Sequence, residues 1–139
     1  MNAPVTNIEY NIVDTIYIVE PIKEIDTVLS AFIQLESNYD STAVNPVSRA
    51  RGILQILPVM IDEANRLSTL KGNDVHYTWD DAWSIDKSIE IWYLVQGHHN
   101  PTYNIPKACR VWFGSGVQYD GMTWVQYYNK ILKYIKAIK

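Results

Sequence analysis

The sequence predicts a mainly α, α-rich single domain with a short N-terminal extended or β segment. The chain has 139 residues, of which 47% are apolar and 19% charged, as is usual for one globular domain. Its longest apolar runs are far shorter than the ~20 residues that a membrane-spanning helix needs. Apolar residues recur at helical spacing in most of the chain after Pro21, and this period predicts amphipathic helices.

The first part of the chain divides into an N-terminal segment and a first helix. Residues 8–19 are rich in Ile, Val, Tyr and Thr and partly alternate, which predicts one or two short strands or an extended arm. We therefore assign residues 1–20 to an N-terminal extended segment and residues 21–139 to the domain. Helical spacing predicts a helix from about Ile25 to Ser37, followed by a polar loop over 38–51.

Four further helices are expected. Pro58 suits the first turn of a helix that ends near Leu70. Helices are also expected over 82–96, over 105–113 and from about residue 123 onward. The residues that carry these last three predictions are Ile85, Ile89, Trp92 and Val95 on the inner face of the first, the Asn104 cap and Gly114 stop of the second, and Trp124, Tyr127, Tyr128, Ile131, Ile135 and Ile138 on one face of the third.

Composition and charge exclude several classes of protein. One cysteine, Cys109, cannot form an internal disulfide or a cysteine-based zinc site. The net charge of −3 argues against a general nucleic-acid binder. The last 19 residues hold four lysines and no acid; we favour a solvated helix end over a contact patch for an anionic polymer. His98 and His99 would point about 100° apart on a helix, so we expect a role at the helix end rather than a metal site, and no cofactor.

Glu36 is the residue that most strongly indicates chemistry. It follows Phe32 by four residues and Leu29 by seven, so it shares the apolar face of its helix. Desolvation and the C-terminal end of the helix dipole would both raise the pKa of its carboxyl group. A carboxylic acid that donates a proton near neutral pH needs such a raised pKa. The alternative is a buried glutamate paired with an arginine such as Arg49, Arg51 or Arg66.

The residues around Glu36 add a motif. Glu36-Ser37 is followed by a polar loop with Asn45-Pro46, then by Gly52-Ile53-Leu54-Gln55 and by Pro58. This arrangement resembles the soluble (SLT-type) lytic transglycosylase family of the lysozyme-like superfamily. In that family a Glu-Ser pair at a helix end precedes a Gly-Leu-Met-Gln segment and a proline that opens the next helix. The resemblance spans about residues 25–70 and implies a lysozyme-like fold.

The resemblance also implies roles for individual residues. Glu36 matches the catalytic glutamate, and Ser37, Gly52 and Gln55 match substrate-site positions. Glycine at position 52 would allow backbone to approach the Glu36 helix or a sugar closely, and the Gln55 amide suits an acetamido group or a hydroxyl. Its alternative role is a capping amide at the turn.

A second family motif, Tyr-Asn-Ala-Gly, is poorly kept in the sequence. Its best counterpart is Val111–Gly114, in which Trp112 stands at the aromatic position and Phe113 replaces the asparagine. The family's tyrosine hydroxyl would then have to come from elsewhere, with Tyr103, Tyr119 and Tyr127 as candidates. Tyr103, near a loop, is also a candidate groove wall, because aromatic faces suit pyranose rings.

The implied function is cleavage of the β-1,4 bond between N-acetylmuramic acid and N-acetylglucosamine in peptidoglycan, with Glu36 as sole acid and base and a 1,6-anhydro product. One alternative is a lysozyme-like muramidase, a hydrolase in which Asp40 or Asp81 holds a water. Another is a catalytically weak glycan-binding or structural module, such as part of a phage virion. We expect a monomer outside such a particle. Because the first 20 residues lack a secretory signal pattern, we expect delivery to the periplasm or cell wall by a phage, at lysis or through a dedicated export system.

Overall fold

The structure is a computed structural model that describes residues 25–114 and 121–138, and this part of the chain is mainly helical. Its elements are α1 (Thr27–Ser37), α2 (Pro58–Leu70), the 3-10 turn η1 (Trp79–Trp83), α3 (Ile85–His99), α4 (Ile105–Phe113) and α5 (Trp124–Ile138). The mainly α prediction is thereby confirmed. The extended segment expected over 8–19 lies outside the described residues.

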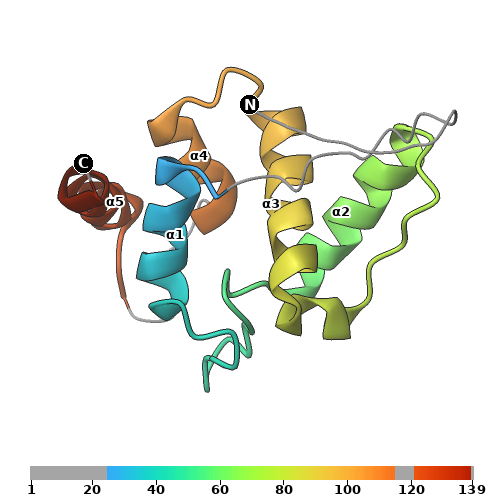
Figure 1. The fold of residues 1–139 in the computed structure, drawn as a ribbon, viewed down its shortest axis with the longest axis horizontal. Coiled ribbons are helices and arrows are strands. Elements are labelled where there is room, and N and C mark those ends of the chain that lie inside the picture. Colours follow the sequence, from blue (N-terminus) through green and yellow to red (C-terminus); the bar gives the residue numbers. More distant parts are fainter. Residues whose placement is uncertain (1–24, 115–120, 139) are drawn as a thin grey trace, which may run out of the picture.

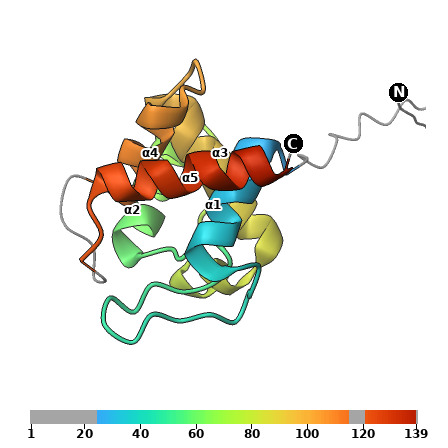
Figure 2. The same ribbon diagram turned by 90° about the vertical axis from the view of Figure 1, so that its left-hand side faces the viewer.

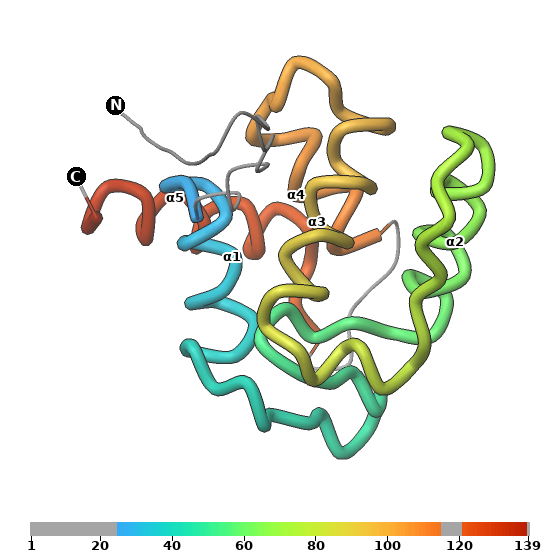
Figure 3. The backbone as a smooth tube through the Cα atoms, turned by 45° about the vertical axis from the view of Figure 1, so that its right-hand side comes forward, coloured from blue at the N-terminus to red at the C-terminus, as the bar shows by residue number. Residues whose placement is uncertain are grey.

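The helices form two groups, one of α1, α4 and α5 and the other of α2, η1 and α3. The contact between α3 and α4 joins the two groups. Helix α5 lies across α1 and α4 and packs on both, as Figure 2 shows. Helix α3 packs against α2 on one side and α4 on the other, and η1 lies at its start (Figure 1). The chain between α1 and α2 runs beneath the helices and connects the two groups (Figure 3). This arrangement lets the helices α1 to α5, the loop between α1 and α2, and the residues Gly114 and Met122 beside α4 and α5 contribute to the same cavity, described below.

Aromatic side chains from α1, α3, α4 and α5 meet in the core. The ring centroids of Phe32 and Trp92 lie 4.5 Å apart, and those of Trp92 and Trp112 lie 4.9 Å apart. Tyr127 of α5 packs on Phe32 at 5.7 Å and on Phe113 at 4.9 Å between ring centroids. Tilted and edge-on pairs at these separations add stabilisation beyond area burial. The packing therefore fixes the position of α5 relative to the end of α1.

Local signals explain where α1 begins and ends. The Asp26 carboxylate accepts a hydrogen bond from the amide of Leu29 at 2.7 Å, which satisfies an otherwise free donor at the first turn. Asn38 and Tyr39 then adopt left-handed backbone, with φ of 52° and 65°. Two successive left-handed residues cannot continue a right-handed helix. The helix therefore ends directly after Glu36 and Ser37, as predicted.

The other predicted helices are confirmed, with one change of boundary. Helices α2, α4 and α5 begin and end within a residue of expectation, and Asn104 caps α4 through the amide of Lys107. The helix expected over 82–96 instead spans Ile85–His99, because Ser84 caps it and the preceding residues form η1. Consequently Ile85, expected on the inner face, is 45% exposed, and the adjacent histidines lie within the helix.

In the described ranges, 25–114 and 121–138, we find no helix with the length and apolar character to cross a membrane.

Candidate functional site

A cavity of about 600 Å³ opens between the two groups of helices. This volume lies in the range of small-molecule sites. Its polar lining comes from Glu36, Gln55, Glu63, His99, Tyr127 and Lys130. The rest of its wall is largely apolar: Leu35, Ala50, Leu57, Val59, Met60, Val95, Val111, Trp112, Phe113, Gly114 and Met122.

Glu36 reaches this cavity from the last turn of α1. The Tyr127 hydroxyl donates a hydrogen bond to Oε2 of the Glu36 carboxylate, across 91 residues of sequence. A tilted contact with Phe32 and an edge-on contact with Phe113 hold the phenol ring of Tyr127 in place. Of the three tyrosines considered from the sequence, Tyr127 therefore contacts the glutamate. Tyr119 lies outside the described residues.

The segment Gly52–Gln55 is tied to the end of α1 and to α4. Ser37 donates a hydrogen bond from Oγ to the Ile53 carbonyl at 2.7 Å. The Trp112 indole donates from Nε1 to the Leu54 carbonyl at 3.1 Å. Trp112 is only 3% exposed, so this predicted substrate-binding residue lines the cavity with its ring while its N–H holds the backbone. Ser37, outside the cavity lining, likewise holds the backbone.

Gly52 is required for close packing of backbone, as predicted, but against a different neighbour. Its φ is +81°, and a Cβ built on it would lie 1.9 Å from the carbonyl oxygen of Ala82 in η1. The neighbour expected from the sequence was the Glu36 helix or a sugar. The structure corrects this, since η1 occupies that space. Gly52 thus allows the turn to pack against η1, and it does not line the cavity.

Gln55 is buried and serves mainly to close the turn. Its φ is +51°, and its Nε2 donates to the carbonyls of Gly52 at 3.0 Å and Ala43 at 3.2 Å. The Nε2 group of Gln55 therefore has the structural role that the sequence offers as the alternative, an amide that closes the turn. Gln55 still lines the cavity, and none of the described residues donates a hydrogen bond to its Oε1. That oxygen is the part of the side chain that can accept one from a ligand.

A second carboxylate, Glu63 of α2, lies in the cavity wall. Arg66 binds it with two hydrogen bonds, from Nε at 2.7 Å and Nη2 at 2.8 Å. His99, at the end of α3, lies 2.6 Å from Glu63 through Nε2. The Arg66 hydrogen bond, with smaller contributions from His99, lowers the pKa of Glu63 to about 2. Glu63 is therefore a fixed anion at neutral pH, unsuited to donating a proton.

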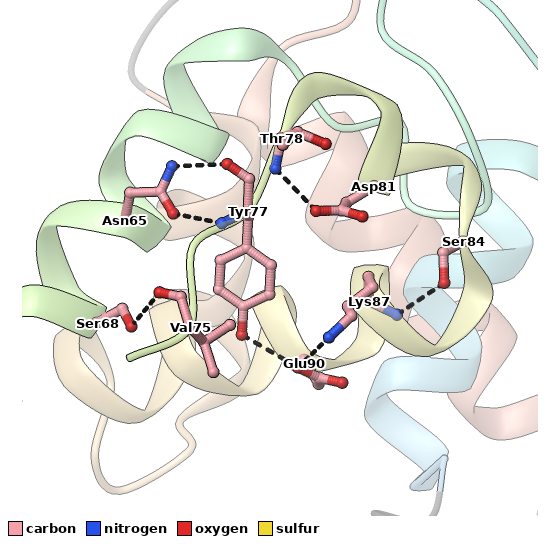
Figure 4. A network of polar contacts seen from close by, with 9 residues as sticks. All are labelled: Asn65, Ser68, Val75, Tyr77, Thr78, Asp81, Ser84, Lys87 and Glu90. Carbon is pink, nitrogen blue, oxygen red and sulfur yellow. Dashed lines mark hydrogen bonds and ion pairs between the residues drawn. The ribbon is translucent and has the colours of Figure 1, made fainter. Parts of the chain in front are cut away.

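Two further residues predicted for the site, Asp40 and Asp81, lie outside the cavity lining. Asp40 is exposed, and its bonds to the hydroxyl and amide of Thr42 lower the pKa of its carboxyl group. Asp81 accepts a hydrogen bond from the amide of Thr78 at 2.8 Å, within the network drawn in Figure 4. Neither lines the cavity. Both carboxylates close local turns, as Asp commonly does, and this corrects their candidacy as a second site carboxylate.

Tyr103 is likewise placed away from the cavity. Its hydroxyl donates to the Asp26 carboxylate at 2.8 Å and accepts from Nε1 of Trp92 at 3.2 Å. Burial raises the pKa of the Tyr103 phenol. Its contacts join the start of α1 to α3, so its role in the structure is to brace the two helices and not to form a groove wall.

The network in Figure 4 also ties the segment after α2 to that helix. Asn65 of α2 exchanges two hydrogen bonds with the backbone of Tyr77, at 2.8 Å and 2.7 Å. Ser68 donates to the carbonyl of Val75 at 2.8 Å. These bonds hold residues 75–77 along the side of α2.

Three cavity residues, Glu63, His99 and Lys130, were not predicted from the sequence. Glu63 and Lys130 occur among polar residues on faces that look solvated, so no pattern distinguishes them. The predicted helix ends at residue 96, whereas α3 continues to His99 and brings this side chain to the cavity. Over the described part of the chain, no three His, Cys, Asp or Glu side chains gather as metal ligands. Cys109 is buried, and burial raises the pKa of its thiol to about 12.

Comparison of the chain with protein-family models, with curated protein sequences and with solved structures gave no significant match.

Proposed function

We propose that this protein is a lytic transglycosylase that cleaves the β-1,4 bond between N-acetylmuramic acid and N-acetylglucosamine in peptidoglycan. The observation that carries the proposal is the position of Glu36. It ends α1 in the wall of a 600 Å³ cavity, directly beside the tied Gly52–Gln55 turn, with a tyrosine hydroxyl on its carboxylate. A carboxyl group in such a partly apolar cavity suits general acid–base catalysis.

In the proposed reaction Glu36 begins protonated and gives its proton to the glycosidic oxygen as the bond from that oxygen to C1 breaks. The substrate's own N-acetyl group meets the positive charge that develops at C1, as in other substrate-assisted glycosidases. The C6 hydroxyl of the same sugar then attacks C1, and its proton returns to Glu36. No water is consumed, and the product carries a 1,6-anhydro ring.

The distribution of carboxylates supports this route over hydrolysis. A hydrolase of the two-carboxylate type uses a second acidic residue to form an intermediate or to hold a water. Asp40 and Asp81 do not line the cavity, and the oxygens of Glu63 are engaged by Arg66 and His99. Glu36 can perform both proton transfers alone, since the C6 hydroxyl is held within the same substrate.

The experiment is digestion of purified peptidoglycan by the wild-type protein and by Glu36→Gln. We expect the wild type to release soluble muropeptides and the variant to lose turnover by at least ~10²-fold. Glutamine has nearly the same size as glutamate and can still accept a hydrogen bond from Tyr127, so the variant should unfold near the wild-type temperature. Full release by a folded Glu36→Gln protein would refute the assignment. Its unfolding would instead indicate a structural glutamate.

A further inference from the structure

His99 stands in the cavity wall with one ring nitrogen already engaged. Its Nε2 lies 2.6 Å from Oε2 of Glu63, and its ring packs edge-on against His98 with centroids 4.8 Å apart. The side chain of His99, at the end of α3, is 38% exposed. The imidazole is thus held in place from two sides and still open to the cavity.

The contact with Glu63 determines which nitrogen carries the proton. An ionised carboxylate can only accept hydrogen bonds, and Arg66 keeps Glu63 ionised through two further N–H groups. Nε2 of His99 must therefore be the donor. In the neutral ring this leaves Nδ1 with a lone pair, as an acceptor. No group among the described residues hydrogen-bonds to Nδ1.

We propose that Nδ1 of His99, oriented by Glu63, accepts a hydrogen bond from a hydroxyl or amide N–H group of the bound glycan. This inference rests on the proposed function, because it assumes that the cavity receives a glycan strand. The ligand offers the hydrogen-bond donors that Nδ1 requires, since every N-acetylated sugar presents hydroxyl groups and one amide N–H. His99 comes from α3 and Glu36 from α1, so the glycan would contact both groups of helices.

The atomic position of the contact can be tested with two amide variants. In His99→Gln the longer amide can still donate to Glu63 from the place of Nε2, but nothing replaces Nδ1. In His99→Asn the shorter amide lies near the place of Nδ1 and cannot reach Glu63. A purely structural histidine would tolerate glutamine better, whereas a glycan-binding Nδ1 would be better replaced by asparagine.

Binding is measured by calorimetry with soluble, uncross-linked glycan strands prepared from peptidoglycan. All proteins carry Glu36→Gln, so that the strands are bound and not cleaved. Loss of one neutral hydrogen bond lowers affinity by about 3- to 10-fold. We expect that loss in His99→Gln, and an affinity within about twofold of the parent in His99→Asn. Thermal unfolding of each variant verifies that it is folded.

The outcomes separate this inference from the proposed function. Unchanged affinity in His99→Gln, or equal losses in the two variants, would overturn the role of Nδ1. A parent protein that binds the strands, combined with a wild type that does not cleave them, would refute catalysis and leave the binding role to be decided by the two variants. A parent that does not bind the strands would overturn the role of His99, and it would overturn the proposed function as well if the wild type also fails to cleave peptidoglycan.

Discussion

Replacing Gly52 by alanine tests how the Gly52–Gln55 turn is held in place. A Cβ at this position would lie 1.9 Å from the carbonyl oxygen of Ala82, so the two backbones would have to separate by about 1.5 Å to reach ordinary contact. That shift would break the bonds from the Gly52 amide to Ala43 at 2.8 Å and from Nε2 of Gln55 to the Gly52 carbonyl at 3.0 Å.

The loss in free energy of unfolding follows from these contacts. Left-handed backbone costs a non-glycine residue about 1 kcal/mol, and each of the two hydrogen bonds contributes about 1 kcal/mol, more if a buried group is left unpaired. We expect Gly52→Ala to lower the free energy of unfolding by about 3–5 kcal/mol. Gly72 is the matched control, because its φ is +74° and no atom lies within 4 Å of a Cβ built there. Gly72→Ala should therefore cost only about 1 kcal/mol.

Urea denaturation of the three proteins, followed by circular dichroism, measures both values. The difference between the two variants isolates the contact with Ala82 from the backbone conformation. A difference of about 2–4 kcal/mol is expected. Equal destabilisation by the two substitutions would refute the close approach of the turn to η1.

Three further predictions follow from the cavity and its surroundings. Tyr127→Phe retains the ring packing but removes the hydroxyl on Glu36, so peptidoglycan turnover should fall by about 10-fold or more while the protein stays folded; unchanged turnover would show that the hydroxyl does not orient the carboxylate. The pKa of Glu63 is lowered in the folded protein from 4.5 to about 2. The contribution of this ionised carboxylate to the free energy of unfolding is therefore fully present above about pH 4.5 and is lost as the pH falls toward 2. In urea titrations Glu63→Gln should lose less stability than the wild type over that window, by about 1 kcal/mol after allowance for solvent screening, and identical slopes would contradict this. Replacing Lys133 and Lys136 by glutamine should leave sedimentation with peptidoglycan unchanged if they only favour the end of α5, and a large, salt-dependent loss would instead indicate an anionic wall polymer.

The sequence was sufficient to predict most helices because their signals are local. Pro58 opens α2, and Asn104 and Gly114 bound α4, through interactions with residues within one turn. The start of α3 was missed because Asp81 closes its own turn with Thr78, so η1 interrupts a segment whose apolar period continues. The hydrogen bond within this turn therefore sets the start of α3, although the apolar period predicts an earlier start.

The candidate site was predictable only where it depends on one helix face. Glu36 follows from its spacing on α1, whereas its partner Tyr127 lies 91 residues away and could not be ranked above Tyr103. Glu63 joins the cavity because α2 packs on α3 and brings it to His99. No spacing in the sequence encodes that contact, because it is created by the packing of two helices.

The most direct test of the proposed lytic transglycosylase is the chemistry of its reaction products. Purified peptidoglycan is digested in water enriched in heavy oxygen, and the released muropeptides are analysed by mass spectrometry, with Glu36→Gln as the control. Capture of C1 by the C6 hydroxyl predicts ends about 18 mass units lighter than hydrolysed ones, the mass of one water, and free of heavy oxygen. Reducing ends that carry heavy oxygen and disappear in Glu36→Gln would contradict this and identify a hydrolase.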